Sequence, residues 1–275
     1  MRLAARCVML EKDVPFVLGA LDPEMREIAK VLRAAERDYY HAAVGGIRVG
    51  TRNAYSADSV VRLSRRRWPL VAVLPPREPA AFVECTVRGN EPLVRIDHHH
   101  PGDPGYACPP ERYMEGASIG QTLHLLEMDA TSTQRLLAAG DHCLTAAYQG
   151  MCPGVDPHEL LFLRASWRAR MSGRSLGDVI DGIDHAVKAV RRNYDSEHGE
   201  SLFLDPTEIP LDVAEAAAYV GCPIRYREWF PNGDLKEMLK GGTPAHIERF
   251  MKMHRKAGRE VYGNPHRGYA GAYMH

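Results

Sequence analysis

The chain has 275 residues, of which 45% are apolar and 25% are charged, and its 35 basic residues balance its 35 acidic ones. This composition is typical of a globular protein with one large domain or two ordinary ones. Zero net charge excludes a chain-wide field that would attract nucleic acid or a membrane, although it leaves room for a local basic patch.

The longest apolar runs are much shorter than a membrane span, and no signal-peptide pattern opens the chain. We therefore expect a cytoplasmic protein without a membrane partner. Its six cysteines are scattered and form no CxxC pair, which argues against a disulfide scaffold and a zinc knuckle. They are Cys7, Cys85, Cys108, Cys143, Cys152 and Cys222.

Strand-like and helix-like segments alternate in the first part of the chain. Residues 14–20 predict a short buried strand, and residues 21–43 follow as a helix that begins near Pro23. Three further apolar segments predict strands: 68–74, 80–87 and 92–96. This alternation predicts an α/β fold, with a parallel sheet covered by helices on both faces.

The middle of the chain has helical periodicity. Three helices are predicted: 118–128, with Ser118 as N-cap, 133–150, and 174–195, which is clearly amphipathic. The polar segment 195–200 is interpreted as a linker.

After this segment, the pattern of strands and helices starts again. The sequence predicts a strand at 201–205, a helix at 210–221, strands at 222–230 and 234–242 around an Asn232-Gly233 turn, and a helix at 243–258. We therefore predict two domains, a larger one over 1–195 and a smaller α/β domain over 196–275.

The stretch "VRIDHHHPGD", residues 94–103, places four ionisable side chains at the predicted end of a strand. A run of histidines can be a solvated loop without a role. Here Asp97, His98 and His99 follow an apolar strand, and Glu84 ends the strand before it. Ligands of open α/β sheets bind at such strand ends, and carboxylates with one or two histidines suit Mn²⁺ or Mg²⁺.

Asp141 is a further candidate ligand, because the predicted helix 133–150 places it on the same face as Leu137, Leu144 and Tyr148. A carboxylate on an apolar face must be paired, hydrogen-bonded or bound to metal. The alternative is an ordinary helix-surface acid. The neighbouring His142 is interpreted as a structural hydrogen-bonding residue.

The segment "RIDHHHPGD" resembles the signature of the DHH phosphoesterase superfamily. Members of that superfamily include RecJ-type exonucleases, nanoRNases, cyclic-dinucleotide phosphodiesterases and family II pyrophosphatases. The strand "AAFVEC" before the signature and "GASIGQTLHLL" after it are similar to the family pattern. In outline the resemblance extends over most of the chain, but only residues 94–103 carry it specifically.

The resemblance implies a site for one or two Mn²⁺ or Mg²⁺ ions. Its ligands would be Asp97, His98, Glu84, Asp141 and, in place of the first family motif, Asp22. Asp97, His98 and His99 would take part in catalysis, and His99 would also face the substrate phosphate.

The chain departs from the family at that first motif, HxxxDxD. It has "GALDPE" there, with Asp22 and Glu24 but no histidine. Both acids also suit the first turn of any helix, since its dipole favours negative charge. The departure leaves the number of metal ions open.

The segment "GNPHRGYAGAY", residues 263–273, is rich in glycine. We expect Arg267, Gly268 and Gly271 to form a loop that binds a substrate anion, and a surface tail is the alternative.

Two functions follow from these features. The first is a metal-dependent phosphoesterase that hydrolyses a phosphodiester or phosphoanhydride bond in a small nucleotide, a dinucleotide or a short oligonucleotide. The second is a non-catalytic protein that senses or sequesters a nucleotide on the same fold. The sequence leaves open whether the protein forms a homodimer.

Overall fold

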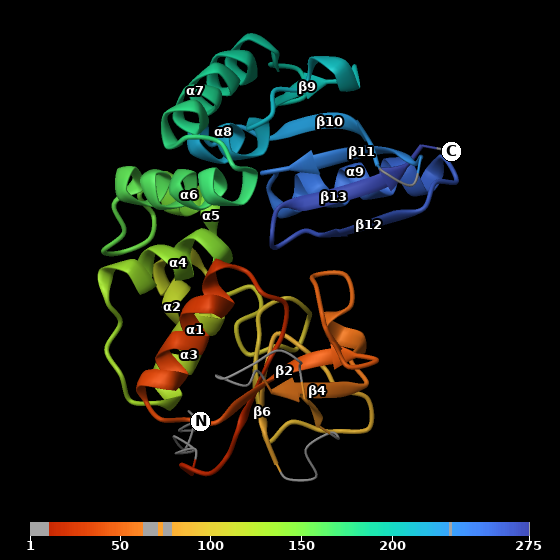
Figure 1. The fold of residues 1–275 in the computed structure, drawn as a ribbon. Coiled ribbons are helices and arrows are strands. Elements are labelled where there is room, and N and C mark those ends of the chain that lie inside the picture. The colour runs from red at the N-terminus through yellow and green to blue at the C-terminus, as the bar shows by residue number, and fades with distance from the viewer. Residues whose placement is uncertain (1–10, 63–70, 74–78, 231–232, 275) are drawn as a thin grey trace, which may run out of the picture. The chain divides into compact units, whose positions relative to one another are not determined.

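The computed structural model describes residues 11–62, 71–73, 79–230 and 233–274 (Figure 1). Its contacts separate the chain into two compact units, Met1–His142 and Cys143–His275. Each unit contains a β-sheet with packed helices, so the predicted α/β fold class is confirmed. The division between the units lies after His142, whereas the sequence analysis placed a domain boundary after residue 195.

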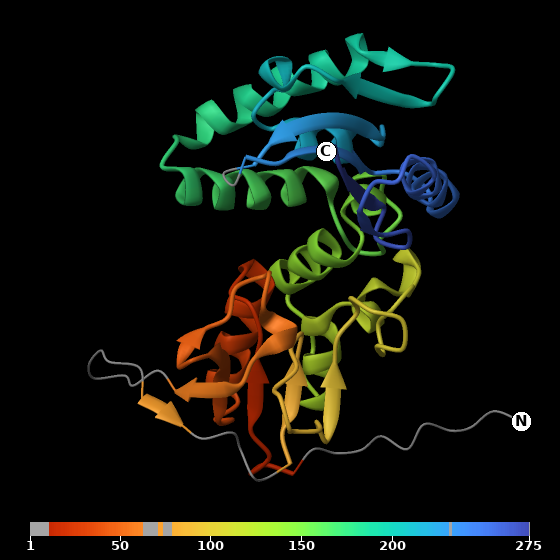
Figure 2. The ribbon, with the colours of Figure 1, turned by 90° about the vertical axis from the view of Figure 1, so that its right-hand side faces the viewer.

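The first unit contains a seven-stranded, mostly parallel sheet with the order β5-β4-β2-β1-β6-β7, and β3 pairs with β2. β1 is parallel to β2 and β6, and β6 is parallel to β7 (Figure 2). The strands are β1 (Phe16–Leu18), β2 (Tyr39–Val44), β3 (Ile47–Arg48), β4 (Ser59–Arg62), β5 (Val71–Val73), β6 (Ala81–Val83) and β7 (Val94–Ile96).

Helices α1, α3 and α4 of this unit pack on one another and lie together beside the sheet (Figure 1). A second apolar cluster includes Val17, Phe82 and Val60 of the strands, and Ala54 of the short 3-10 helix η1 (Ala54–Ser56) packs with it. The helices are α1 (Pro23–Ala34), α2 (Tyr113–Gly116), α3 (Ser118–Leu125) and α4 (Ser132–His142), with a 3-10 turn η2 (Pro110–Arg112) before α2.

The second unit contains a six-stranded mixed sheet with the order β12-β13-β11-β10-β9-β8. Only the β9–β10 pair is parallel among these described strands. The strands are β8 (Tyr194–Asp195), β9 (Glu200–Phe203), β10 (Ile224–Trp229), β11 (Leu235–Lys240), β12 (Val261–Asn264) and β13 (Tyr269–Tyr273).

Two apolar clusters lie on opposite faces of this sheet. Ile224, Tyr226 and Met238 point toward α6, α7 and α8, whereas Leu239 and Ala270 point toward α9. The helices are α5 (Leu144–Tyr148), α6 (Pro157–Ser172), α7 (Leu176–Arg192), α8 (Val213–Val220) and α9 (Pro244–Lys256), and η3 (Pro206–Glu208) precedes α8. Thr243 caps α9, since its hydroxyl accepts a hydrogen bond from the amide of His246.

Three segments differ from the sequence predictions. The predicted helix 21–43 ends at Ala34, and its last residues form β2. The predicted helix 133–150 breaks at Cys143 into α4 and α5, so Asp141 does not share one continuous helix face with Leu144 and Tyr148. The supposed linker 195–200 is the turn that joins the antiparallel strands β8 and β9.

Other expectations lie partly outside the described residues. Strand β5 covers Val71–Val73 of the predicted strand 68–74, and Asn232 of the predicted turn is not described. Among the described helices, none combines the length and apolar character needed to cross a membrane.

Candidate metal centre

Acidic and histidine side chains follow three adjacent parallel strands at the edge where those strands end. Asp22 and Glu24 come after β1, Glu84 follows β6 directly, and Asp97 with His98 follows β7. Because β1, β6 and β7 run in the same direction, their carboxyl ends lie side by side, and this is where open α/β sheets bind ligands.

The backbone at Glu84 is held in an unusual conformation. Its φ angle of 48° lies in the left-handed region, which a residue with a β-carbon adopts only at a cost. Its amide donates to the carbonyl of Ile96 over 3.0 Å, and Gly19 passes so closely that a β-carbon there would collide with the Glu84 carbonyl. The chain thus turns the Glu84 carboxylate toward the ends of its neighbouring strands.

Four side chains from different elements converge at this edge: Glu24, Glu84, His98 and Asp141. One ligand atom from each lies within 4.8 Å of the others. His98 Nε2 lies 3.0 Å from Asp141 Oδ2 and 3.4 Å from Glu84 Oε1. Glu24, Glu84 and His98 are buried, and Asp141 is partly buried. Three carboxylates thus surround one buried imidazole.

A hydrogen-bonded relay sets the tautomer of His98. His142 Nε2 lies 2.8 Å from the carbonyl of Cys108, which can only accept, so His142 carries its proton on Nε2. His142 Nδ1 then accepts from His98 Nδ1 over 2.9 Å, and the two rings are stacked. His98 Nε2 is consequently left facing the carboxylates. A metal-binding histidine is oriented by its other nitrogen in the same way.

The carboxylates of this cluster repel one another. Burial, together with Asp141 and Glu84, raises the pKa of Glu24 well above its ordinary value and raises the pKa of Asp22 to about 7. Burial alone would lower the pKa of His98, but Asp141 and Glu84 raise it to about 9. The cluster therefore needs a positive charge, which either a proton or a metal cation can supply.

Two carboxylate oxygens of this cluster accept hydrogen bonds from the first residues of α3. Glu24 Oε1 accepts from the amide of Ile119 at 3.0 Å, and Glu84 Oε1 accepts from the Ser118 hydroxyl at 2.8 Å. Among the described residues, the buried Glu24 Oε2 has no hydrogen-bond partner. A buried carboxylate oxygen facing two other acids fits a cation ligand.

Asp97 has a different environment from these four residues. Its carboxylate accepts from the amides of His98 and His99, at 2.7 and 3.0 Å, and from the hydroxyl of Tyr55 and Nδ1 of His99. Although burial opposes it, hydrogen bonding from His99 lowers the pKa of Asp97. Asp97 therefore fixes the conformation of the histidine turn.

His99 lies at the border of this cluster. Its side chain is 28% exposed, and one of its nitrogens lies within 4.8 Å of ligand atoms of Glu84 and His98. Asp97 groups with His100 and Asp103 in a separate set of possible ligands. The chemistry available here is cation binding by the buried residues, with the partly exposed imidazole of His99 beside them.

The structure thus brings together four of the side chains singled out from the sequence: Glu84, His98, His99 and Asp141. Asp22 interacts electrostatically with Asp141 and Glu84. Arg267, Gly268 and Gly271 belong to the second unit, where they form part of the β12–β13 hairpin and not an isolated glycine loop.

Two contributors were not assigned a place in the site from the sequence: Tyr55 and Ser118. Glu24 was named with Asp22 at the position of the first family motif, but only Asp22 was included among the predicted ligands. Ser118 was expected to cap α3, but it bonds to Glu84, and the N-cap residue is Ala117. No local sequence signal links Tyr55 to Asp97, 42 positions away.

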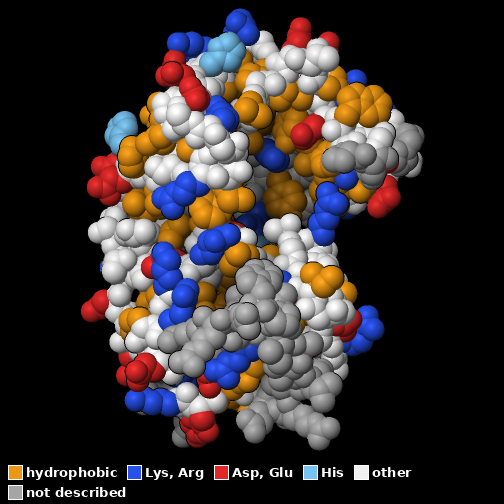
Figure 3. All heavy atoms as spheres, viewed as in Figure 1, with side chains coloured by type: hydrophobic (Ala, Val, Ile, Leu, Met, Phe, Trp, Pro, Cys, Tyr) orange, Lys and Arg blue, Asp and Glu red, His pale blue; other side chains and the backbone are white. Residues whose placement is uncertain are grey.

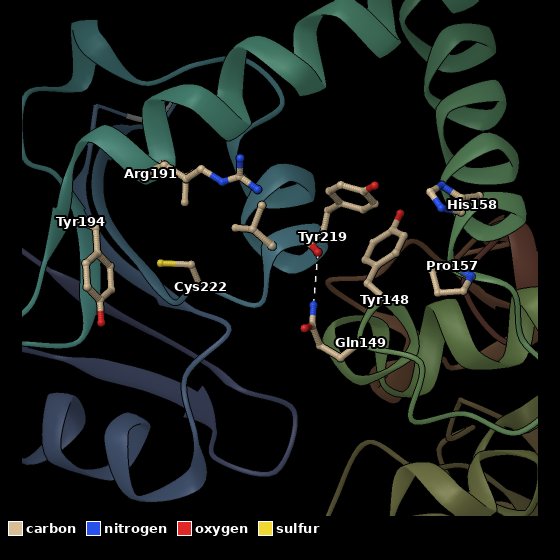
Figure 4. A pocket seen from close by; sticks show the side chains of 10 residues that line it. Tyr148, Gln149, Pro157, His158, Arg191, Tyr194, Tyr219 and Cys222 are labelled. Carbon is tan, nitrogen blue, oxygen red and sulfur yellow. Dashed lines mark hydrogen bonds between the residues drawn. The ribbon is translucent and has the colours of Figure 1, made fainter.

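A separate cavity of about 690 Å³ lies in the second unit (Figure 4). The rings of Tyr148, Tyr194 and Tyr219 line it together with Arg191 and His158, and none of its ten described lining residues is acidic. Tyr148 and Tyr219 meet edge to face in it. These side chains suit an aromatic anion.

Comparison of the chain with protein-family models finds no match, and comparison with curated proteins finds no relative.

Proposed function

We propose that this protein is a metal-dependent phosphoesterase that hydrolyses a phosphodiester or phosphoanhydride bond in a small nucleotide, a dinucleotide or a short oligonucleotide. The observation that supports it most is the convergence of Glu24, Glu84, His98 and Asp141 at the carboxyl ends of parallel strands. The resemblance of residues 94–103 to the DHH signature points to the same chemistry.

The donor set fits Mn²⁺ better than a purely oxygen-binding ion, because it combines carboxylates with one imidazole. A bound ion would lower the pKa of a water molecule and neutralise charge that develops on the phosphate. Glu24, Glu84, His98 and Asp141 would hold the ion, and Asp22 and Asp97 are further candidates. His142 keeps Nε2 of His98 directed at the site.

We propose that His99 contacts the substrate phosphate. Its Nδ1 is 2.9 Å from Asp97 Oδ1, which fixes the orientation of the ring, and part of the side chain faces solvent. In this role His99 would donate a hydrogen bond to a phosphate oxygen while the buried residues hold the ion.

Metal content and hydrolysis test this proposal together. Purified protein is loaded with Mn²⁺, dialysed and analysed for bound metal, and then assayed on a dinucleotide, a short oligonucleotide and pyrophosphate. One or two ions per chain, together with hydrolysis of one substrate, support the proposal. Metal-free protein that still hydrolyses its substrate would contradict it.

The second unit has a sheet face that suits a nucleotide or oligonucleotide substrate. Tyr262, Tyr269 and Tyr273 of β12 and β13 share this face with Lys236 and Lys240 of β11. Tyr262 and Tyr269 are exposed, and the ammonium of Lys236 lies 4.2 Å from the ring centre of Tyr273. Figure 3 shows hydrophobic and basic side chains interspersed over this unit. Such side chains stack on bases and attract phosphates.

Of the three residues expected to bind substrate, Gly268 and Gly271 have structural roles in the hairpin that carries these tyrosines. Gly271 leaves room for the Tyr262 ring, which a β-carbon there would meet, and Gly268 has a φ of +67° in the turn. Arg267 lies in the same turn, where its amide is bonded to the side chain of Asn264. We propose that Arg267 contacts a substrate phosphate.

Binding of a labelled oligonucleotide in chelator tests this face without catalysis. Tyr262→Ala and Arg267→Ala should each weaken binding by about tenfold, since a base stack or a charge-assisted hydrogen bond contributes roughly 1–3 kcal/mol. Trp229→Ala is the matched control, because Trp229 is 61% exposed but lies on the opposite face of the sheet. Equal losses in all three variants would exclude this face as the binding surface.

A non-catalytic nucleotide-binding protein is the second candidate function. The cavity lined by Tyr148, Tyr219 and Arg191 favours it, since it suits an aromatic anion and lies in the unit without the candidate metal centre. Nucleotide binding without bound metal, and without hydrolysis after Mn²⁺ loading, would favour this function over the first.

A further inference from the structure

Two cysteines lie in contact on either side of α5. The Sγ atoms of Cys143 and Cys152 are 3.2 Å apart, although the residues are nine positions apart in the chain. Cys143 precedes the first residue of α5 and is partly exposed, whereas Cys152 lies beyond the helix and is 2% exposed. Neither cysteine is in a disulfide in the structure.

We propose that this pair is an oxidation site, at which Cys143 and Cys152 form a reversible disulfide with a small-molecule disulfide such as oxidised glutathione. The distance between the two sulfurs has to shorten by only about 1 Å to reach the length of an S–S bond.

The reaction proceeds in two exchanges. The more exposed Cys143 attacks one sulfur of oxidised glutathione, which releases one glutathione and leaves a mixed disulfide. Cys152 then attacks the Cys143 sulfur and releases the second glutathione. Two protein thiols are oxidised, one small disulfide is reduced to two thiols, and the two protons are taken up by the released thiolates.

The bond would close a short loop that contains all of α5. Helix α5 carries Tyr148, whose hydroxyl donates to the buried Glu215 over 2.5 Å and whose ring lines the cavity of the second unit. Cys143 also follows Asp141 and His142 directly in the chain. Oxidation would therefore restrict the segment between the candidate metal centre and α5.

Mass spectrometry of the full-length protein tests the proposal. After incubation with oxidised glutathione and alkylation of the remaining thiols, we expect the intact chain to lose two hydrogen atoms and to have two fewer alkylation sites. Digestion should yield one cross-linked peptide pair containing Cys143 and Cys152. Reduction with dithiothreitol should restore both thiols.

Variants separate this pair from the other thiols. Cys152→Ser should trap glutathione on Cys143 as a mixed disulfide, whereas Cys222→Ser, a change in the same unit, should leave the cross-link intact. Oxidised wild type should also show slower amide hydrogen exchange in α5 than reduced protein. Wild type that keeps both thiols free, or that cross-links other cysteines, would overturn the proposal, and this result does not depend on how the variants fold.

Discussion

Each unit of the molecule contains buried carboxylates, and the two sets differ in what neutralises them. In the second unit, Glu215 receives hydrogen bonds from Arg164 at 2.6 and 2.8 Å, and Arg168 and Tyr148 also donate to it. Although burial opposes ionisation, these donors lower the pKa of Glu215 to about 2. Asp212 beside it is paired with Arg174 and Arg168.

In the first unit, the hydrogen bonds described for Glu24 and Glu84 come from the amide of Ile119 and the hydroxyl of Ser118. Glu24, Glu84 and Asp141 face one imidazole, and the pKa of Glu24 is raised instead of lowered. Two buried acids of one chain, Glu24 and Glu215, thus have pKa values shifted in opposite directions. The acids of the second unit are thus neutralised by arginines, whereas the cluster around His98 could hold a cation.

The largest expected effect concerns activity. His98→Ala and Asp141→Asn should each lower hydrolysis by about 1000-fold or more, since a bound metal contributes several kcal/mol to the transition state. Bound Mn²⁺ should fall in parallel. His185→Ala, on the exposed side of α7, is the control and should leave both unchanged. Full activity in either site variant would remove that residue from the proposed ligands.

The next largest effect is on folding stability, and its sign should differ between the two clusters. Arg164→Ala should destabilise the protein by about 3 kcal/mol, because it leaves the buried Glu215 with fewer donors. Glu24→Gln should instead stabilise the metal-free protein at pH 7 by about 1 kcal/mol, because glutamine is neutral, whereas burial of Glu24 requires either a charge among like charges or the uptake of a proton. The amide oxygen of glutamine can still accept from Ile119.

Urea unfolding in the presence of a chelator measures both changes. Mn²⁺ should stabilise the wild type more than Glu24→Gln, since the variant loses a ligand. If both variants are destabilised to the same degree, the distinction between the two clusters is wrong.

The smallest effect is a pair of opposite pH dependences. In metal-free protein the folded-state pKa of Asp22, about 7, exceeds its ordinary value of 3.8, so folding binds a proton. Its contribution is present at low pH and is lost as pH rises from about 4 to about 7. For Glu215 the folded value of about 2 is below the ordinary 4.5, so its contribution is lost as pH falls from 4.5 to 2.

Asp22→Asn and Glu215→Gln isolate these contributions. The stability of Asp22→Asn relative to wild type should increase from pH 4 to pH 7, on the order of 1 kcal/mol, while asparagine keeps the N-cap of α1. The stability lost in Glu215→Gln should shrink below pH 4.5. Parallel pH profiles for the two variants would contradict the comparison.

The strand ends could be predicted from the sequence because each acidic or histidine residue directly follows a short apolar run. Glu84 and His98 were found in this way. Asp141 was selected from a helix face that continued to Tyr148, but the helix breaks at Cys143, and its position beside His98 comes from tertiary packing of α4.

Glu24 was not predicted as a ligand because an acid in a first helical turn is already explained by the helix dipole. Contacts between residues far apart in the chain could not be predicted from the sequence either. The Tyr55–Asp97 hydrogen bond depends on how η1 packs against the sheet, and no local pattern encodes that. Strand β2 was missed because its residues continue the spacing of the helix before it.

The left-handed backbone at Glu84 makes this position informative in a mutational scan. Glycine adopts such a φ without cost, whereas glutamate costs about 1 kcal/mol there. A selection for cellular abundance alone should therefore enrich glycine or asparagine at this position. A selection for function should keep an acid, so the two screens would rank the same substitutions in opposite order.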